Sequence, residues 1–122
     1  MSKYGLWEIG NGTGNYHPDS PDARTETTIT NAAVDEANRR YREDGIFIFK
    51  LHGGGYQRSG IPDVYVAIKG NSIWVEFKRP GADTTKLQRN KLLLLLKAGM
   101  FCGTAESTET FIDIIEQVKR LG

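Results

Sequence analysis

Two apolar segments separated by only four residues place the strongest constraint on how this chain folds. Val64–Ile68 and Ile73–Phe77 are rich in β-branched and aromatic residues, which favour β-strands. The polar link Lys69–Ser72 between them is short enough for a tight turn. The sequence therefore predicts an antiparallel hairpin.

The register of this hairpin decides which side chains meet. A two-residue turn at Gly70-Asn71 would place Asp63 opposite Lys78, with Glu76 diagonally beside Asp63. Side chains alternate along a strand and paired residues share a face, so the two acids and the lysine are expected on one face. The opposite face is wholly apolar and holds Val64, Val66, Ile68, Ile73, Val75 and Phe77.

Two carboxylates and an ammonium above an apolar sheet are typical of a site for a hard divalent metal. Carboxylate oxygens suit Mg²⁺ or Mn²⁺, and a lysine can position a water or offset the charge of a phosphate. The pattern thus favours metal-assisted phosphodiester hydrolysis. A ladder of surface ion pairs is the alternative interpretation, and these three residues alone do not separate the two.

Flanking residues favour the metal site. Pro62 falls where a strand begins and a missing N–H is tolerated, and Pro80-Gly81 ends the second strand sharply. The ordered motifs are Gly60-Ile61-Pro62-Asp63, Glu76-Phe77-Lys78-Arg79-Pro80-Gly81, Thr85-Lys86-Leu87-Gln88 and Ala98-Gly99. In this order and spacing, the chain from Thr25 onward resembles the VRR-NUC family of the PD-(D/E)xK nuclease superfamily, in its stand-alone phage and bacterial form.

The resemblance implies roles for individual residues. Asp63, Glu76 and the backbone carbonyl of Phe77 would bind the metal, and Lys78 would assist the attacking water. Gln88 would lie beside the lysine, although Thr85-x-x-Gln88 is also a capping box that helix stabilisation alone explains. The implied activity is that of an endonuclease dependent on Mg²⁺ or Mn²⁺, acting on branched DNA such as Holliday junctions as a homodimer.

A first helix is predicted from Glu26 to Arg42, with Thr25 as its N-cap. Its expected inward stripe comprises Ile29, Ala33, Ala37 and Tyr41. Glu26 lies near the centre of this stripe, which makes it the better candidate for the helix glutamate that the family contributes to its metal site. Glu36, near the edge of the stripe, is the alternative, and Glu26 could also serve only as a partner of the helix dipole.

The remaining segments complete an α/β domain. Strands are expected at Ile46–Leu51 and Met100–Glu106, and a helix at Glu109–Leu121 with Phe111, Ile114, Ile115, Val118 and Leu121 facing inward. The Leu-rich helix that starts after Thr85 is long enough for a crossover to a parallel strand. It could cover the sheet and offer a dimer contact, or lie buried between the sheet and the last helix. The predicted fold is a restriction-endonuclease-like three-layer α/β/α domain with a central mixed sheet, in the order α-β-β-β-α-β-α.

Charge is distributed unevenly along the chain. The net charge is +1, but residues 50–97 hold nine Lys or Arg against Asp63, Glu76 and Asp83. A basic middle enclosing an acidic site suits a phosphodiester substrate, although each cation could simply solvate the surface. The candidate DNA contacts are Lys50, His52, Tyr56, Arg58, Arg79, Lys86 and Arg89.

Composition indicates one small domain. Of the 122 residues, 39% are hydrophobic and 25% are charged. Residues 1–22 are expected to form a flexible arm before a single domain over 23–122. No apolar stretch approaches the roughly 20 residues of a membrane span, and no signal peptide is evident. Cys102 can form no internal disulfide and is expected in the core, in keeping with a cytoplasmic protein, or the host cytoplasm for a phage protein.

The sequence thus predicts a divalent-metal-dependent DNA endonuclease that cleaves branched DNA in the manner of a Holliday-junction resolvase. A flap or nicking nuclease with the same site is one alternative. A DNA-binding module that no longer cleaves is another, and the joint presence of Asp63, Glu76 and Lys78 argues against it.

Overall fold

The computed structural model describes residues 25–51 and 60–121. In chain order the elements are α2 (Glu26–Arg40), the short 3₁₀ helix η1 (Arg42–Asp44), β1 (Phe47–Lys50), β2 (Val64–Ile68), β3 (Asn71–Phe77), α3 (Lys86–Lys97), β4 (Phe101–Ala105) and α4 (Thr108–Leu121). The expected arm at residues 1–22 and the residues His52, Tyr56 and Arg58 lie outside the described part. Within that part, no helix has the length and apolar character needed to cross a membrane.

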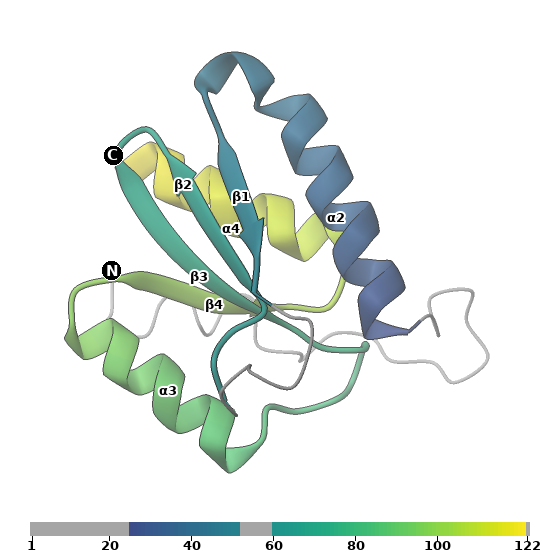
Figure 1. Ribbon diagram of the computed structural model, residues 1–122, viewed down its shortest axis with the longest axis vertical. Helices are drawn as coiled ribbons and strands as arrows, with labels where there is room; N and C mark the ends of the chain where they lie inside the picture. The colour runs from purple at the N-terminus through teal and green to yellow at the C-terminus, as the bar shows by residue number, and fades with distance from the viewer. Residues whose placement is uncertain (1–24, 52–59, 122) are drawn as a thin grey trace.

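The four strands form one mixed sheet in the order β1-β2-β3-β4. Strands β1, β2 and β3 pair antiparallel, and β4 pairs parallel to β3 after the crossover through α3. Helices α2 and α4 pack together on one face of the sheet, whereas α3 lies on the other (Figure 1). These three layers confirm the predicted order and class. The interpretation of α3 as buried between the sheet and the last helix is wrong, because the sheet separates α3 from α4.

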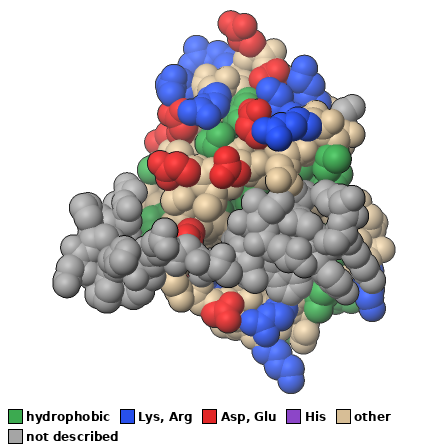
Figure 2. Space-filling view, turned by 180° about the vertical axis from the view of Figure 1, so that it is seen from behind, with side chains coloured by type: hydrophobic (Ala, Val, Ile, Leu, Met, Phe, Trp, Pro, Cys, Tyr) green, Lys and Arg blue, Asp and Glu red, His purple; other side chains and the backbone are tan. Residues whose placement is uncertain are grey.

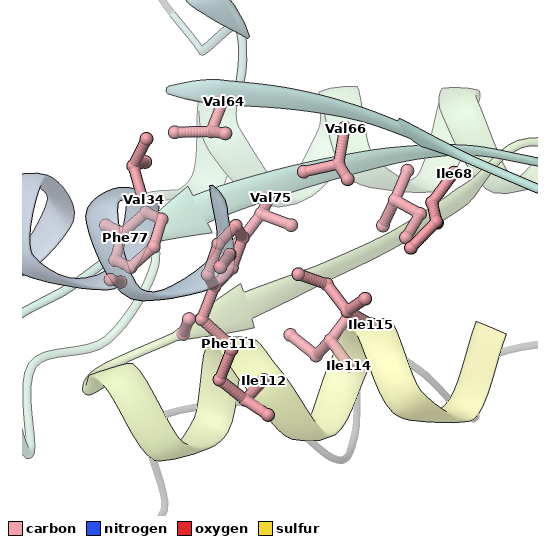
Figure 3. Packing of buried hydrophobic residues seen from close by; sticks show 14 of the residues in the cluster. Val34, Val64, Val66, Ile68, Val75, Phe77, Phe111, Ile112, Ile114 and Ile115 are labelled. Carbon is pink, nitrogen blue, oxygen red and sulfur yellow. The ribbon is translucent and has the colours of Figure 1, made fainter. Parts of the chain in front are cut away.

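The apolar face of the hairpin forms the main core against α2 and α4 (Figure 3). All six hairpin residues predicted for this face are at most 1% exposed. Phe77 packs against Phe111 of α4 with ring centroids 5.2 Å apart. The predicted stripe of the first helix and four of the five residues predicted for α4 are buried as expected. Leu121 was placed inward wrongly, since it is the final residue of α4 and is 52% exposed.

The hairpin register differs from the prediction by two residues. The turn is Lys69-Gly70, with φ values of 53° and 78°, and it leaves Ile68 paired with Asn71. This register pairs Tyr65 with Trp74, whose rings meet edge to face at 5.1 Å. The aromatic contact offsets the cost of a left-handed lysine. Because side chains alternate with a period of two, the predicted faces are nevertheless kept.

A smaller apolar cluster lies under α3 on the other face of the sheet. Leu92 and Cys102 are fully buried there, with Trp74, Leu93, Leu95 and Leu96 packed around them. The Cys102 thiol donates a hydrogen bond to the Leu92 carbonyl oxygen at 3.4 Å. Burial raises the pKa of this thiol to about 12. Cys102 is therefore a core residue, as predicted, and is not an activated nucleophile.

Candidate active site

Asp63 is fixed at the end of the hairpin by two hydrogen bonds. Its Oδ2 accepts from the backbone N–H of Phe77 at 2.9 Å, and its carbonyl oxygen accepts from the N–H of Leu51 at 2.7 Å. Continuing the observed register by one pair places Asp63 opposite Glu76, not opposite Lys78 as predicted. The two carboxylates are therefore direct cross-strand neighbours on the face that carries α3.

Glu76 is the most perturbed acid of the site. It is 3% exposed, and its Oε2 accepts a hydrogen bond from Gln88 Nε2 at 2.9 Å. Lys78 Nζ lies 3.9 Å from the same oxygen. Burial and, to a smaller extent, the neighbouring Asp63 raise the pKa of Glu76 to about 9, whereas Lys78 opposes the shift. Its other oxygen, Oε1, is buried without a hydrogen-bond partner among the described residues.

This arrangement fits a divalent cation. Glu76 has a buried oxygen without a partner among the described residues, and its raised pKa favours the protonated form when no cation is present. A cation beside Asp63 and Glu76 would favour the ionised form of both carboxyl groups. Nowhere in residues 25–51 and 60–121 do three His, Cys, Asp or Glu side chains lie close enough to form a complete ligand set. Mg²⁺ commonly uses only one or two protein carboxylates and takes its other ligands from water and substrate phosphate. Asp63 and Glu76 match that requirement.

The two candidate helix glutamates have different surroundings. Glu26, in the first turn of α2, is partly buried, and its charge contributes to the raised pKa of Glu76. Glu36 instead forms ion pairs with Arg39 at 2.6 Å and Arg40 at 3.2 Å. Arg39 lowers the pKa of Glu36 through their hydrogen bond. Glu26 is therefore the helix residue whose charge reaches the carboxylate pair.

Gln88 links α3 to this site. Its Oε1 accepts from the backbone N–H of Thr85, and Thr85 Oγ1 accepts from the backbone N–H of Gln88, which completes the predicted capping box. The same side chain donates through Nε2 to Glu76. Helix capping and contact with the site, the two roles considered for Gln88, therefore coexist.

The motif glycine Gly60 allows α3 to approach the Asp63 loop. Its φ is +87°, and an added Cβ would lie 2.9 Å from Leu87 Cγ and 3.0 Å from the Leu87 carbonyl oxygen. A side chain would thus be strained in backbone and in packing. This close approach brings the first turn of α3 over the loop that carries Asp63.

Comparison with solved structures supplies the deciding observation. A solved structure described as a VRR_NUC domain matches this chain with a TM-score of 0.57 and 25% sequence identity, covering 70% of this chain and 92% of that one. The chain is therefore similar in fold to a VRR-NUC domain. No family model matches its sequence, and no curated protein matches it. This similarity supports a nuclease-type domain and agrees with the mixed four-stranded sheet.

The structure does not gather all predicted DNA contacts around the acidic pair of Asp63 and Glu76. Lys50 turns to the opposite face of the sheet, where its Nζ donates to Asn31 Oδ1 of α2 at 2.7 Å. Arg89 Nη2 lies 3.6 Å from Asp83 and donates to the Thr84 carbonyl oxygen. Arg79 and Lys86 are exposed on either side of the loop between β3 and α3. His52, Tyr56 and Arg58 are not among the described residues.

The sequence analysis did not identify Glu106, a buried acid next to Lys78. The N–H of Lys78 donates to the Ala105 carbonyl oxygen at 2.9 Å, so the β3–β4 pairing extends toward Lys78 and Glu106. Glu106 is 9% exposed, and its Oε2 has no hydrogen-bond partner among the described residues. The signal was available, because parallel pairing of the last strand with Ile73–Phe77 brings their carboxyl ends to one edge.

The two roles of Gln88 can be separated by mutation. Thr85→Ala removes the cap but leaves the Gln88–Glu76 hydrogen bond, so we expect a loss of about 1 kcal/mol in the free energy of unfolding and unchanged cleavage. Gln88→Ala removes both contacts, and we expect cleavage to fall about 10- to 100-fold as well. Urea unfolding and single-turnover cleavage of labelled DNA measure the two effects. Equal cleavage by both variants would restrict Gln88 to capping.

Proposed function

We propose that this VRR-NUC-like domain is a divalent-metal-dependent DNA endonuclease that hydrolyses phosphodiester bonds in branched DNA. The observation that carries the proposal is the buried Glu76 beside Asp63 and Lys78, with one oxygen that lacks a partner in the part of the chain that the structure describes. A structural ion pair would satisfy its oxygens, whereas Glu76 Oε1 has no partner among residues 25–51 and 60–121. The arrangement favours a metal site over the ion-pair alternative.

Each residue has a distinct part in this proposal. Asp63 and Glu76 would hold Mg²⁺ or Mn²⁺, with the Phe77 carbonyl and Glu26 as further ligands, directly or through water. The ion would supply positive charge at the scissile phosphate. Lys78 would orient the attacking water as an ammonium, or take its proton as a neutral amine. Gln88 keeps the Glu76 carboxylate in place through its 2.9 Å hydrogen bond.

The charge distribution supports a nucleic-acid substrate on the α3 side. Helix α3 carries Lys86, Arg89, Lys91 and Lys97 and no acidic residue. The face seen from behind in Figure 2 instead shows acidic and basic side chains intermixed over its upper half. A phosphate backbone is attracted to the first surface and not to the second.

A homodimer is proposed for the cleavage of two strands. Leu87 and Leu94 of α3 are 46% and 58% exposed, which provides apolar area for a two-fold contact. A two-fold dimer would place two sites symmetrically across a four-way junction. The second candidate function is a flap or nicking nuclease with the same site, which needs only one copy.

Cleavage assays test the proposal. Purified protein is incubated with labelled four-way junctions, flaps and linear duplex in Mg²⁺, in Mn²⁺ and in EDTA, alongside Asp63→Asn. We expect cleavage of branched DNA that requires metal and is lost in the variant. Paired symmetrical nicks in the junction would favour the resolvase over the flap nuclease. Binding without cleavage on every substrate would overturn the enzyme proposal and leave a DNA-binding module.

A further inference from the structure

Two aromatic side chains on β1 are unusually exposed. Phe47 is 58% exposed and Phe49 is 54% exposed. The β1–β2 register pairs them with Ala67 and Tyr65, whereas Ile48 between them packs on the main core. Both phenylalanines therefore project from the sheet face that also carries Asp63 and Glu76. We call Phe47 and Phe49 the aromatic strip.

The strip is left open because α3 covers only part of this face. The contacts of α3 are with β4 and with Trp74 of β3, at the side of the sheet away from β1. Within residues 25–51 and 60–121, no helix covers the β1 side of the same face. Exposed phenylalanines in alternate positions of one strand offer flat apolar surfaces to a ligand.

The strip is continuous with the candidate active site. Leu51, two residues after Phe49, donates its N–H to the carbonyl oxygen of Asp63. Two residues of a strand span about 7 Å, so Phe49 and then Phe47 lead away from Asp63 in steps of that length. Along another part of this face runs α3, with four basic residues and no acid. Proteins that bind single-stranded nucleic acid combine exposed aromatic side chains with a neighbouring basic surface.

Resting on the nuclease function above, we propose that the aromatic strip stacks unpaired bases of the strand whose phosphate lies at Asp63 and Glu76, while α3 contacts its backbone. The substrate class is then DNA with a single-stranded segment next to the branch. A second copy of this chain is the competing occupant. The four-residue edge strand, ending in the charged Lys50, is a poor template for pairing with another copy.

Binding measured without cleavage tests the strip. Fluorescein-labelled oligothymidylate of about 15 nucleotides and a duplex of equal length are titrated in EDTA, and anisotropy gives Kd. The variant Phe47→Leu with Phe49→Leu keeps apolar area but removes the rings. We expect it to bind oligothymidylate at least about tenfold more weakly, with duplex binding unchanged. Leu121→Ser, which removes a 52% exposed apolar side chain from α4, is the matched control and should bind like wild type.

Three other outcomes would contradict the proposed role of the aromatic strip. They are unchanged oligothymidylate binding by the double leucine variant, equal weakening of duplex binding, or the same loss in Leu121→Ser. Sedimentation of each variant measures its oligomeric state and so tests whether a second copy of the chain binds the aromatic strip. If the double leucine variant lost both dimerisation and oligothymidylate binding, the strip would be a self-association surface. Because EDTA prevents metal-dependent cleavage, a failed nuclease assay with intact ring-dependent binding would reject the enzyme and not the strip.

Discussion

Replacing Lys78 with methionine should lower single-turnover cleavage of branched DNA about 10³-fold and leave DNA binding within about twofold of wild type. The side chain is only 11% exposed and its ammonium lies 3.9 Å from Glu76, so its charge acts inside the site and not on the DNA surface. Methionine keeps most of the buried volume, which limits the loss of packing. Rapid-quench cleavage in Mg²⁺ and anisotropy titration in EDTA give the two quantities.

A second lysine variant tests whether loss of one positive charge anywhere on the protein lowers cleavage. Lys69 lies in the hairpin turn, at the opposite end of the hairpin from Lys78, and pairs with Asp44 at 3.5 Å. Lys69→Met removes the same charge at a distance from the site, so its cleavage should match wild type. If both variants lost cleavage equally, net charge would explain the effect. If Lys78→Met cut normally, its assigned part in the reaction would be wrong.

The metal-free protein should become more stable when Glu76 is replaced with glutamine. The pKa of Glu76 rises from 4.5 in the unfolded chain to about 9 in the folded protein. Between these pH values the folded state therefore binds a proton that the unfolded chain lacks. The free energy of unfolding of wild type therefore falls as the pH rises through this window. Glutamine cannot ionise, and its carbonyl can still accept from Gln88. We expect a gain of about 2 kcal/mol or more at pH 8, vanishing near pH 4.5.

Urea unfolding in EDTA over this pH range measures the gain from Glu76→Gln. Glu36→Gln is a control of opposite sign, because the pKa of Glu36 is lowered by Arg39 and the ion pair contributes only above the unfolded pKa. Added Mg²⁺ should stabilise wild type and not Glu76→Gln, since ligand binding to the folded state raises stability by mass action. If the difference in free energy of unfolding between wild type and Glu76→Gln did not change with pH, the buried charge of Glu76 would not be the cause of that difference.

Strand alternation explains why the faces of the hairpin could be predicted although its register could not. Lys69-Gly70-Asn71-Ser72 contains more than one dipeptide that can form a two-residue turn. The choice was settled by the contact of Tyr65 with Trp74 and by the 2.7 Å hydrogen bond between the Tyr65 and Ser72 hydroxyls. Such contacts depend on three-dimensional packing, which short-range turn preferences do not encode.

The same distinction applies to the site. The shared face of Asp63 and Glu76 could be predicted because strand alternation acts over short stretches, whereas the position of Gln88 beside them followed only from the family resemblance. The parallel β3–β4 pairing brings Glu106 next to Lys78, and this long-range pairing had to be combined with the hairpin register to place it. Lys50 was expected at the substrate, but its position in β1 directs it to α2. Sequence alone also could not tell which leucines of α3 stay exposed, since leucines occupy nearly every azimuth of that helix.

The β2–β3 hairpin has a consequence for the order of folding. Asp63 and Phe77 are joined by a hydrogen bond across only 14 residues of sequence, so the hairpin alone brings the acids together. Burial of Glu76 and its contact with Gln88 require α3 to cross over and β4 to dock, which are slower non-local events. We therefore expect the chain to form a solvated, ionised pair first and to enclose it later. A metal ion present during folding would meet its ligands before the surroundings that disfavour their charge have assembled.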